Sequence, residues 1–327
     1  MRYREIGPDD RKLTVSVIAL GAMLMGSRTD EETSYAILDR FVEAGGTFLD
    51  TANNYAFWVA GDNMGGQSEE LLGRWRKDRG IGDEIKIATK VGGRPLKPGP
   101  DFSQGMEPLT AANIRASAER SLERMGLERL DLYYAHVQDL DVPLEEQVEA
   151  FGQLAADGTV GILGASNHWA WRVERARTLA KAAGLPAYDV LQYSHSYLNA
   201  RTDQPALRAP EGNAGTASGE IRSLVRDQGL HLVAYSPLLS GAYVRADKPM
   251  RDSFDHAGTP PRRAALAEVV KQTGATANQV VLSWLIGGEL PVVPLVGASS
   301  VAQLDETLAA VDLDLTPEQR ELLDAAG

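Results

Sequence analysis

The stretch Gly46-Thr-Phe-Leu-Asp50-Thr-Ala-Asn-Asn-Tyr55 decides how the rest of the chain is interpreted. Its residues Thr47–Thr51 form a short apolar run that predicts a buried strand, after which the chain enters a loop. Asp50 lies at the end of that strand and Tyr55 just beyond it. In a β/α barrel the carboxyl ends of the strands share one cleft, and catalytic residues lie there. The stretch therefore places a carboxylic acid and a phenol where the catalytic residues of a β/α barrel would lie.

The rest of the chain repeats a short apolar run followed by an amphipathic stretch. The other strand-like runs are Val17–Leu20, Ile85–Thr89, Leu130–Ala135, Val160–Gly164, Val190–Gln192, His231–Tyr235 and Val292–Val296. The helical stretches are Asp30–Ala44, Ser68–Lys77, Thr110–Met125, Leu144–Ala156, Trp169–Ala183, Ser218–Gln228, Pro261–Thr273 and Val301–Ala310. Strands that alternate with helices predict a parallel sheet. Eight such units predict an α/β protein with a closed (β/α)8 TIM barrel.

Additional elements are expected at both ends of the chain. Residues 1–14 predict an N-terminal β-hairpin, and residues 276–287 and 316–326 predict extra helices. Helix starts are marked by Thr110, by Asn167 or His168, and by Thr316-Pro317. We expect residues 1–327 to form a single barrel domain. An open doubly wound sheet is the alternative, but Leu20–Gly26 lacks the glycine spacing that such folds carry after their first strand.

Composition excludes several classes of protein. The chain is 43% hydrophobic, carries a formal net charge of −12 and contains no cysteine. Disulfides and thiolate metal sites are therefore excluded, we expect no metal site, and the acidic balance disfavours nucleic acid as a partner. No apolar run has the length of a membrane span, and no apolar segment follows Met1–Glu5 as in a secretion signal. We expect a cytoplasmic protein with no membrane partner.

Two further strand ends carry residues that suit proton transfer. Lys90 follows one apolar run and His136 follows another. A lysine ammonium near the Tyr55 phenol favours the phenolate and lowers the phenol pKa, while Asp50 holds the ammonium charged. A histidine can hydrogen-bond a substrate oxygen. Such a cluster suits protonation of an alkoxide formed when a hydride reaches a carbonyl.

Each of these four residues also has an ordinary structural interpretation. Asp50 can cap a loop, and Tyr55 can be an aromatic residue at a surface. Lys90 can be a solvated strand end, and His136 a hydrogen-bonded structural histidine. The catalytic interpretation depends on all four falling at strand ends of one barrel.

In this order, Asp50, Tyr55, Lys90 and His136 resemble the catalytic tetrad of the aldo-keto reductases. The D-T-A-x-x-Y stretch, the S-E-x-x-L-G helix at Ser68–Gly73 and the G-x-S-N motif at Gly164–Asn167 are also similar to family motifs, as is Tyr235-Ser-Pro-Leu238. The resemblance covers nearly the whole chain. It implies a nicotinamide cofactor, NADP(H) by the family default, that lies across the barrel mouth.

The resemblance also implies which residues bind that cofactor. Ser166, Asn167 and Gln192 would hold the nicotinamide carboxamide, and Tyr235 would stack on the ring. The pyrophosphate would lie on Ser236, Leu238 and Gly241. The adenosine end would lie on the segment after the last strand, with Gly297, Ser299, Gln303 and Glu306.

Two segments depart from the family pattern. No lysine or arginine occurs from Pro294 to Leu315, where many NADPH-specific members place a base for the 2′-phosphate. NAD(H) is therefore the alternative cofactor, unless a base from another loop, such as Arg245, compensates. His195 stands where the family often has tyrosine. It is either a structural hydrogen-bonding residue, which we favour, or a substrate or cofactor contact.

Long loops after strands are expected to shape the substrate site. They span Val91–Pro108, Tyr193–Gly215 and Leu238–Pro260, and the loop Phe57–Gly66 is also longer than usual. Apolar residues near strand ends are candidates for a substrate pocket: Met23, Phe57, Trp58 and Trp169.

The leading hypothesis is an NAD(P)H-dependent reductase of a small aldehyde or ketone, with sugar-derived carbonyl compounds among the candidates. The main alternative is a cofactor-sensing binding subunit with little turnover. A phosphate-binding barrel of unrelated chemistry would leave the order of the four residues unexplained. The sequence leaves the physiological substrate and the oligomeric state open.

Overall fold

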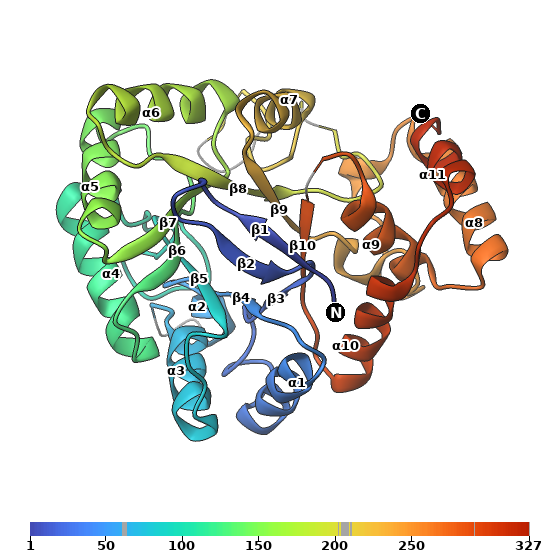
Figure 1. Cartoon of the computed structure of the whole chain (residues 1–327), viewed down its shortest axis with the longest axis horizontal. Coiled ribbons are helices and arrows are strands. Elements are labelled where there is room, and N and C mark those ends of the chain that lie inside the picture. The colour runs from blue at the N-terminus through green and yellow to red at the C-terminus, as the bar shows by residue number, and fades with distance from the viewer. Residues whose placement is uncertain (61–63, 202, 204–208, 210, 291, 327) are drawn as a thin grey trace.

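Eight parallel strands close into a barrel in this computed structural model, which describes residues 1–60, 64–201, 203, 209, 211–290 and 292–326 (Figure 1). The strands pair in the order β10-β3-β4-β5-β6-β7-β8-β9, so sequence neighbours are also neighbours in space. They are β3 (Ala19–Gly21), β4 (Phe48–Asp50), β5 (Lys86–Val91), β6 (Leu130–Ala135), β7 (Val160–Ser166), β8 (Tyr188–Ser194), β9 (His231–Tyr235) and β10 (Val292–Val296). The predicted (β/α)8 barrel is confirmed.

Helices surround the barrel and cover its outer surface (Figure 1). The main ones are α1 (Glu31–Glu43), α3 (Gln67–Arg79), α4 (Ala111–Met125), α5 (Leu144–Ala156), α6 (Ala170–Ala182), α7 (Gly219–Gln228), α8 (Thr259–Thr273) and α10 (Val301–Leu308). The predicted extra helices are present as α9 (Ala277–Gly287) and α11 (Pro317–Asp324). Short helical turns occur at α2 (Phe57–Ala60), η1 (Leu239–Gly241), η2 (Asp252–Phe254) and η3 (Ala309–Asp312). No helix in the described ranges has both the length and the apolarity needed to cross a bilayer.

The predicted N-terminal hairpin closes the amino end of the barrel. Its strands β1 (Tyr3–Ile6) and β2 (Leu13–Ser16) pair antiparallel and cross the centre of the ring of strands (Figure 1). Ile6, Leu13 and Val15 pack with interior side chains such as Phe48 at the start of β4. Burial of these apolar side chains holds the hairpin against the barrel, because each removes apolar surface from water.

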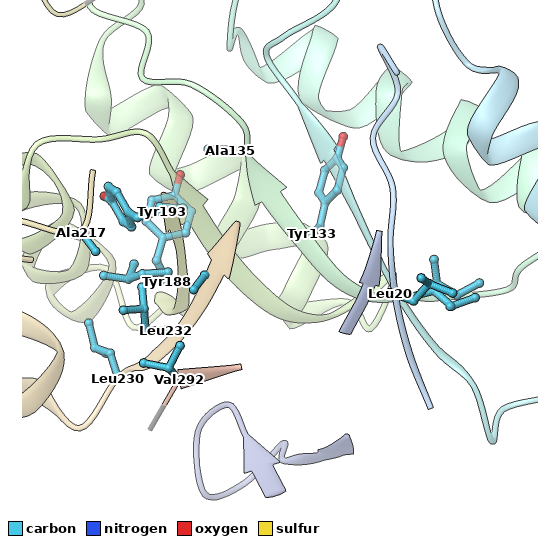
Figure 2. Packing of buried hydrophobic residues seen from close by; sticks show 14 of the residues in the cluster. Leu20, Tyr133, Ala135, Tyr188, Tyr193, Ala217, Leu230, Leu232 and Val292 are labelled. Carbon is cyan, nitrogen blue, oxygen red and sulfur yellow. The ribbon is translucent and has the colours of Figure 1, made fainter. Parts of the chain in front are cut away.

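A larger apolar cluster lies between the strands and the helices (Figure 2). Side chains alternate between this layer and the barrel interior, as the period of a strand requires. On β6, Tyr133 belongs to the outer layer and Tyr134 to the interior cluster. The same alternation decides which side chains reach the barrel mouth.

Three local predictions need correction. The first barrel strand begins at Ala19, because Val17 and Ile18 form the link from the hairpin. Helix α6 has Trp169 as its N-cap rather than Asn167 or His168. The expected Phe57–Gly66 loop begins with the helical turn α2, and its residues 61–63 lie outside the described part of the chain.

Candidate active site

The four tetrad residues meet at the carboxyl end of the barrel because of strand alternation. Asp50 and Lys90 each lie two residues after an interior side chain, Phe48 on β4 and Ala88 on β5. His136 likewise lies two residues after Tyr134 of β6. Side chains two apart on a strand face the same side, so all three are directed to the barrel axis.

Lys90 is the centre of this group. Its Nζ lies 2.5 Å from an Asp50 carboxylate oxygen, 2.7 Å from the Thr51 carbonyl oxygen and 2.9 Å from the Tyr55 hydroxyl. The Lys90 side chain is fully buried, so it is not the solvated strand end that the sequence also allowed. A buried ammonium requires paired and hydrogen-bonded surroundings, and these three oxygens supply them.

Gln192 is a further member of the group that sequence reasoning assigned only to the cofactor. Its Nε2 donates to the second Asp50 oxygen at 2.7 Å. An ionised carboxylate only accepts hydrogen bonds, so this contact fixes which end of the amide faces Asp50. The signal in the sequence is its spacing, since Gln192 lies two residues after the interior Val190 of β8.

Glu107 ties together the two loops that frame the site, and the sequence analysis missed it. One of its carboxylate oxygens accepts from Asn53 Nδ2 at 2.8 Å, from the Gly92 N–H at 2.8 Å and from the Arg94 N–H at 3.1 Å. Asn53 belongs to the loop that carries Tyr55. The buried carboxylate therefore fixes the loop after β5 against the loop that bears the phenol.

Electrostatics at the site differ from the expectation for Tyr55. Burial, followed by the Asp50 carboxylate, raises the pKa of the Tyr55 phenol well above its ordinary value. Burial also lowers the pKa of Lys90, while Asp50 acts in the opposite direction. The predicted net lowering of the phenol pKa by Lys90 is not found, because burial penalises the phenolate. The phenol is thus protonated at neutral pH.

His136 lies beside Tyr55 as a neutral imidazole. The two ring centroids are 5.9 Å apart, in an edge-to-face arrangement. Burial, followed by the Lys90 ammonium, lowers the pKa of His136 to about 3. The Gly93 backbone approaches the ring so closely that a Cβ at this position would lie 2.7 Å from His136 Nδ1. A side chain larger than hydrogen at residue 93 would displace the imidazole.

Three predicted cofactor residues lie beside the tetrad at the barrel mouth. Asn167 Nδ2 donates to the His136 carbonyl oxygen at 2.9 Å and to Ser166 Oγ at 3.0 Å, and its Oδ1 accepts from the Tyr235 hydroxyl at 2.9 Å. Asn167 has a φ of 56°, a left-handed conformation that non-glycine residues rarely adopt. Ser166, Asn167 and Tyr235 are therefore brought together beside His136.

The predicted pyrophosphate segment has an unusual backbone. Ser236, Leu239 and Ser240 have φ values of 53°, 50° and 58°, and Gly241 has 92°. Left-handed non-glycine residues are strained and cluster at ligand-binding segments. Ser236 and Ser240 line a small cavity of about 20 Å³ next to Arg251. Leu238 lies in the same turn, with its carbonyl accepting from the Gly241 N–H at 2.8 Å.

The predicted adenosine-end residues bond mainly to one another and to α9. Gln303 Oε1 accepts from the Ser299 N–H and hydroxyl, both at 2.9 Å. The Glu306 carboxylate accepts from the Thr276 hydroxyl at 2.6 Å. Gly297 is exposed at the end of β10.

Arg245 is exposed and paired. Two of its guanidinium nitrogens, Nε and Nη2, donate to Asp247 at 3.0 and 2.6 Å. The basic residue that the sequence analysis offered as a compensating 2′-phosphate contact is therefore already partnered by a carboxylate.

The four substrate-pocket candidates lie in different environments. Trp58 packs edge-on to Tyr55, with ring centroids 6.4 Å apart. Phe57 is buried against Phe102 of the long loop after β5, with centroids 4.9 Å apart. Met23 is exposed, and Trp169 is half-buried at the start of α6. Of the four, only Trp58 has a recorded ring contact with a tetrad residue, among the residues that the structure describes.

The fold is a (β/α)8 barrel, and its mouth brings Lys90, Asp50, Tyr55 and His136 into one group. Comparison with known families agrees, because the model of the Aldo/keto reductase family matches residues 17–327. The chain belongs to the aldo/keto reductase family and is an oxidoreductase whose general chemistry is carbonyl reduction.

Several characterised and uncharacterised relatives align over most of the chain. The uncharacterized oxidoreductase YrpG of Bacillus subtilis is 30% identical, over 99% of this chain and 95% of its own length. Norsolorinic acid reductase stcV of Emericella nidulans is 29% identical, over 94% of this chain and 77% of its own length. Aryl-alcohol dehydrogenase [NADP(+)] of Phanerodontia chrysosporium is 28% identical, over 98% of this chain and 85% of its own length.

Proposed function

We propose that the protein is an NAD(P)H-dependent reductase of a small aldehyde or ketone. The observation that carries this proposal is the contact of Lys90 Nζ with both the Asp50 carboxylate and the Tyr55 hydroxyl, at 2.5 and 2.9 Å. A nicotinamide cofactor supplies a hydride for the carbonyl carbon when bound. The alkoxide that results requires a proton, and a protonated phenol beside an ammonium is suited to give it.

In this mechanism each residue has a separate role. Tyr55 donates its hydroxyl proton to the developing alkoxide, and the Lys90 ammonium stabilises the phenolate left behind. Asp50 keeps Lys90 charged and in place, and Gln192 holds the second Asp50 oxygen at 2.7 Å. His136, neutral because of its lowered pKa, hydrogen-bonds the carbonyl oxygen and orients it toward Tyr55.

The residues at the barrel mouth fit a nicotinamide cofactor. Ser166 and Asn167 offer a hydroxyl and an amide for the carboxamide, and Tyr235 offers an aromatic face beside them. The left-handed backbone from Ser236 to Gly241 is the kind of segment that approaches a phosphate group closely. We propose Gly297, Ser299, Gln303 and Glu306 for the adenosine end, with rearrangement of the Ser299–Gln303 contact.

NADP(H) is the proposed cofactor, with NAD(H) as the alternative. The aryl-alcohol dehydrogenase relative is named for NADP(+), which supports NADP(H), whereas the segment 294–315 of this chain offers no basic side chain. Titration of the protein with NADPH and with NADH, followed by the change in cofactor fluorescence, decides between them. Tighter binding of NADPH supports the first choice, and equal or tighter binding of NADH supports the second.

Aryl aldehydes are the first substrates to test, because a relative is named for aryl alcohols and Trp58 lies beside the proton donor. Sugar-derived carbonyl compounds form the second group. Met23, Phe57 and Trp169 remain proposed contributors to the pocket. A cytoplasmic location and a single-domain organisation of residues 1–327 stay predictions.

The Tyr55→Phe variant tests the proposal directly. It removes one oxygen, so the rate of carbonyl reduction should fall by about 10²- to 10⁴-fold while cofactor affinity changes little. Turnover is measured by cofactor absorbance at saturating substrate. A variant that reduces a good substrate at the wild-type rate would refute the role of Tyr55. Cofactor binding by the wild-type protein without turnover of any carbonyl compound would instead favour the cofactor-sensing subunit.

A further inference from the structure

The larger of the described cavities lies apart from the tetrad. It has a volume of about 190 Å³ and lies between the end of β8, the first turn of α7 and η2. Its volume equals that of several water molecules, each of which takes about 30 Å³ in the liquid. Its wall includes the polar side chains of Ser194, His195, Ser196, Asn199, Thr216, Ser218 and Arg222. The Ser196 hydroxyl already donates to the Pro237 carbonyl oxygen at 2.5 Å, so it is not a free donor.

The wall of this cavity carries the positive charge of Arg222, and no aspartate or glutamate of the described residues lines it. Arg222 Nη1 donates to the Ala217 carbonyl oxygen at 3.0 Å, and no carboxylate of the described residues lies within 4.0 Å of its guanidinium. Burial lowers the pKa of Arg222, and the neighbouring cations Arg226 and Arg262 lower it further. This is unusual in a chain with a formal net charge of −12.

His195 is part of the same wall, and the catalytic proposal does not use it. Its ring lies 6.2 Å from that of Trp284 on α9, and its backbone N–H donates to the Tyr235 carbonyl oxygen at 3.2 Å. Burial, followed by Arg222 and Arg262, lowers the pKa of His195 to about 3. Arg222 lines the same cavity as this imidazole.

We propose that this cavity binds a phosphate-class oxyanion, either inorganic phosphate or the phosphate of a small monoester. A guanidinium fork and several hydroxyls are the groups that recognise such anions. The positive end of the α7 dipole lies at the same wall, because Ser218 is the N-cap of this helix and Gly219 its first residue. The anion would supply the carboxylate-like partner that Arg222 otherwise lacks.

The cavity lies next to the proposed cofactor groove. Ser194 and Phe254 line both the large cavity and the small cavity beside Ser236. The Ser194 N–H donates to the Gly215 carbonyl oxygen at 2.8 Å, and the same oxygen accepts from the Tyr235 hydroxyl at 3.0 Å. Occupancy of the cavity is therefore expected to change cofactor affinity. Only this coupling rests on the proposed function, whereas the anion site itself does not.

The experiment titrates the full chain with inorganic phosphate, without cofactor, by isothermal calorimetry in a phosphate-free buffer. Saturable binding is expected for the wild type. Arg222→Ala should weaken it at least about tenfold, the loss typical of one hydrogen bond to a charged group. Arg226→Ala is the matched control, because it removes an exposed arginine of the same helix that does not line the cavity. His195→Tyr, a second variant, should also weaken binding.

The outcomes separate this site from the cofactor groove. If Arg251→Ala, which alters the small cavity, abolishes phosphate binding while Arg222→Ala leaves it intact, the anion lies in the groove and the proposal fails. Absence of saturable binding to the folded wild type also overturns it. Loss of binding in Arg222→Ala with unchanged NADPH affinity supports the anion site and rejects the coupling. Thermal denaturation of each variant checks that it is folded.

Discussion

At the amino end of the barrel, Ile6 of the hairpin packs with Phe48 in an apolar plug, whereas at the carboxyl end Lys90 and Asp50 are buried as an ion pair. Both ends belong to the same strands: β4 begins at Phe48 and ends at Asp50. The apolar plug around Ile6 and Phe48 depends on volume and hydrophobicity. The polar end requires that every buried charge meets a specific partner, because an unpaired one is costly.

This comparison separates residues that stabilise the fold from residues to which we assign catalysis. At the amino end, apolar side chains of similar volume are expected to replace one another in the Ile6–Phe48 cluster at little cost. At the carboxyl end, Lys90, Asp50, Tyr55 and Gln192 form one chain of contacts, so a change at one member alters the others. The predictions below test that difference, from the largest expected effect to the smallest.

Asp50→Ala should have the largest effect on stability. It leaves the fully buried Lys90 ammonium without its carboxylate, so the free energy of unfolding should fall by about 3–5 kcal/mol. Urea denaturation measures this loss. Arg175→Ala is the control, because its pair with Glu145 is exposed and should contribute less than about 1 kcal/mol. Equal losses of unfolding free energy in the two variants would show that the buried Lys90–Asp50 pair contributes no more to stability than an exposed pair.

Ile6→Ala should weaken the amino end without altering catalysis. The deleted side chain is almost fully buried, and such truncations cost about 2–5 kcal/mol. The turnover number of the folded fraction should remain that of the wild type, because the hairpin lies at the opposite end from Tyr55. Denaturation and steady-state kinetics at a temperature below the transition are compared. A fall in kcat with no loss of stability would contradict the division between the ends.

His136→Gln should change the pH dependence of stability. The pKa of His136 is about 3 in the folded protein and about 6.5 when unfolded, so the unfolded state binds the proton first as pH falls. Stability is complete above about pH 6.5 and declines toward pH 3, by up to about 1.4 kcal/mol per pH unit for this residue.

The variant should show a shallower decline in free energy of unfolding between pH 7 and pH 5. The decline should not vanish, because His168 and His195, whose pKa values are lowered to about 4 and about 3, still contribute to the pH dependence of stability. Urea titrations at three pH values measure the slopes. Parallel slopes for wild type and variant would mean that His136 is not protonated preferentially on unfolding.

Ser240→Gly should give the smallest effect, and it should stabilise. Ser240 has a φ of 58° in the strained segment after β9, and glycine adopts this conformation without the penalty. The gain should be about 0.5–1 kcal/mol in thermal or urea denaturation. Ser218→Gly is the contrasting variant, because Ser218 caps α7 with a hydroxyl and its φ is −60°. A loss of stability in Ser240→Gly would argue against stored strain.

Much of the fold was predictable from the sequence because its signals are local and periodic. The apolar runs at Leu130–Ala135 and His231–Tyr235 coincide with β6 and β9, and the amphipathic stretch Leu144–Ala156 coincides with α5. The start of β8 was placed too late, since Tyr188 and Asp189 do not continue the apolar run of Val190. Strand ends shift where pairing with neighbours, rather than hydrophobicity, decides them.

The clustering of Asp50, Tyr55, Lys90 and His136 at one end of the barrel was also predictable, because all four follow or end predicted strands. The contacts of Gln192 with Asp50 and of Glu107 with Asn53 were not, because they join residues far apart in the chain. The direction of the Tyr55 pKa shift was missed for a similar reason. The degree of burial that sets it depends on the whole barrel.

The glycine at the start of the decisive stretch has a consequence for protein engineering. A Cβ on Gly46 would lie 2.4 Å from the Phe41 ring of α1, so the ring occupies the volume of the missing side chain. Positions 41 and 46 should therefore be randomised jointly in mutant libraries. A side chain at residue 46 alone would force the Phe41 ring or the backbone just before the three-residue strand β4 to move.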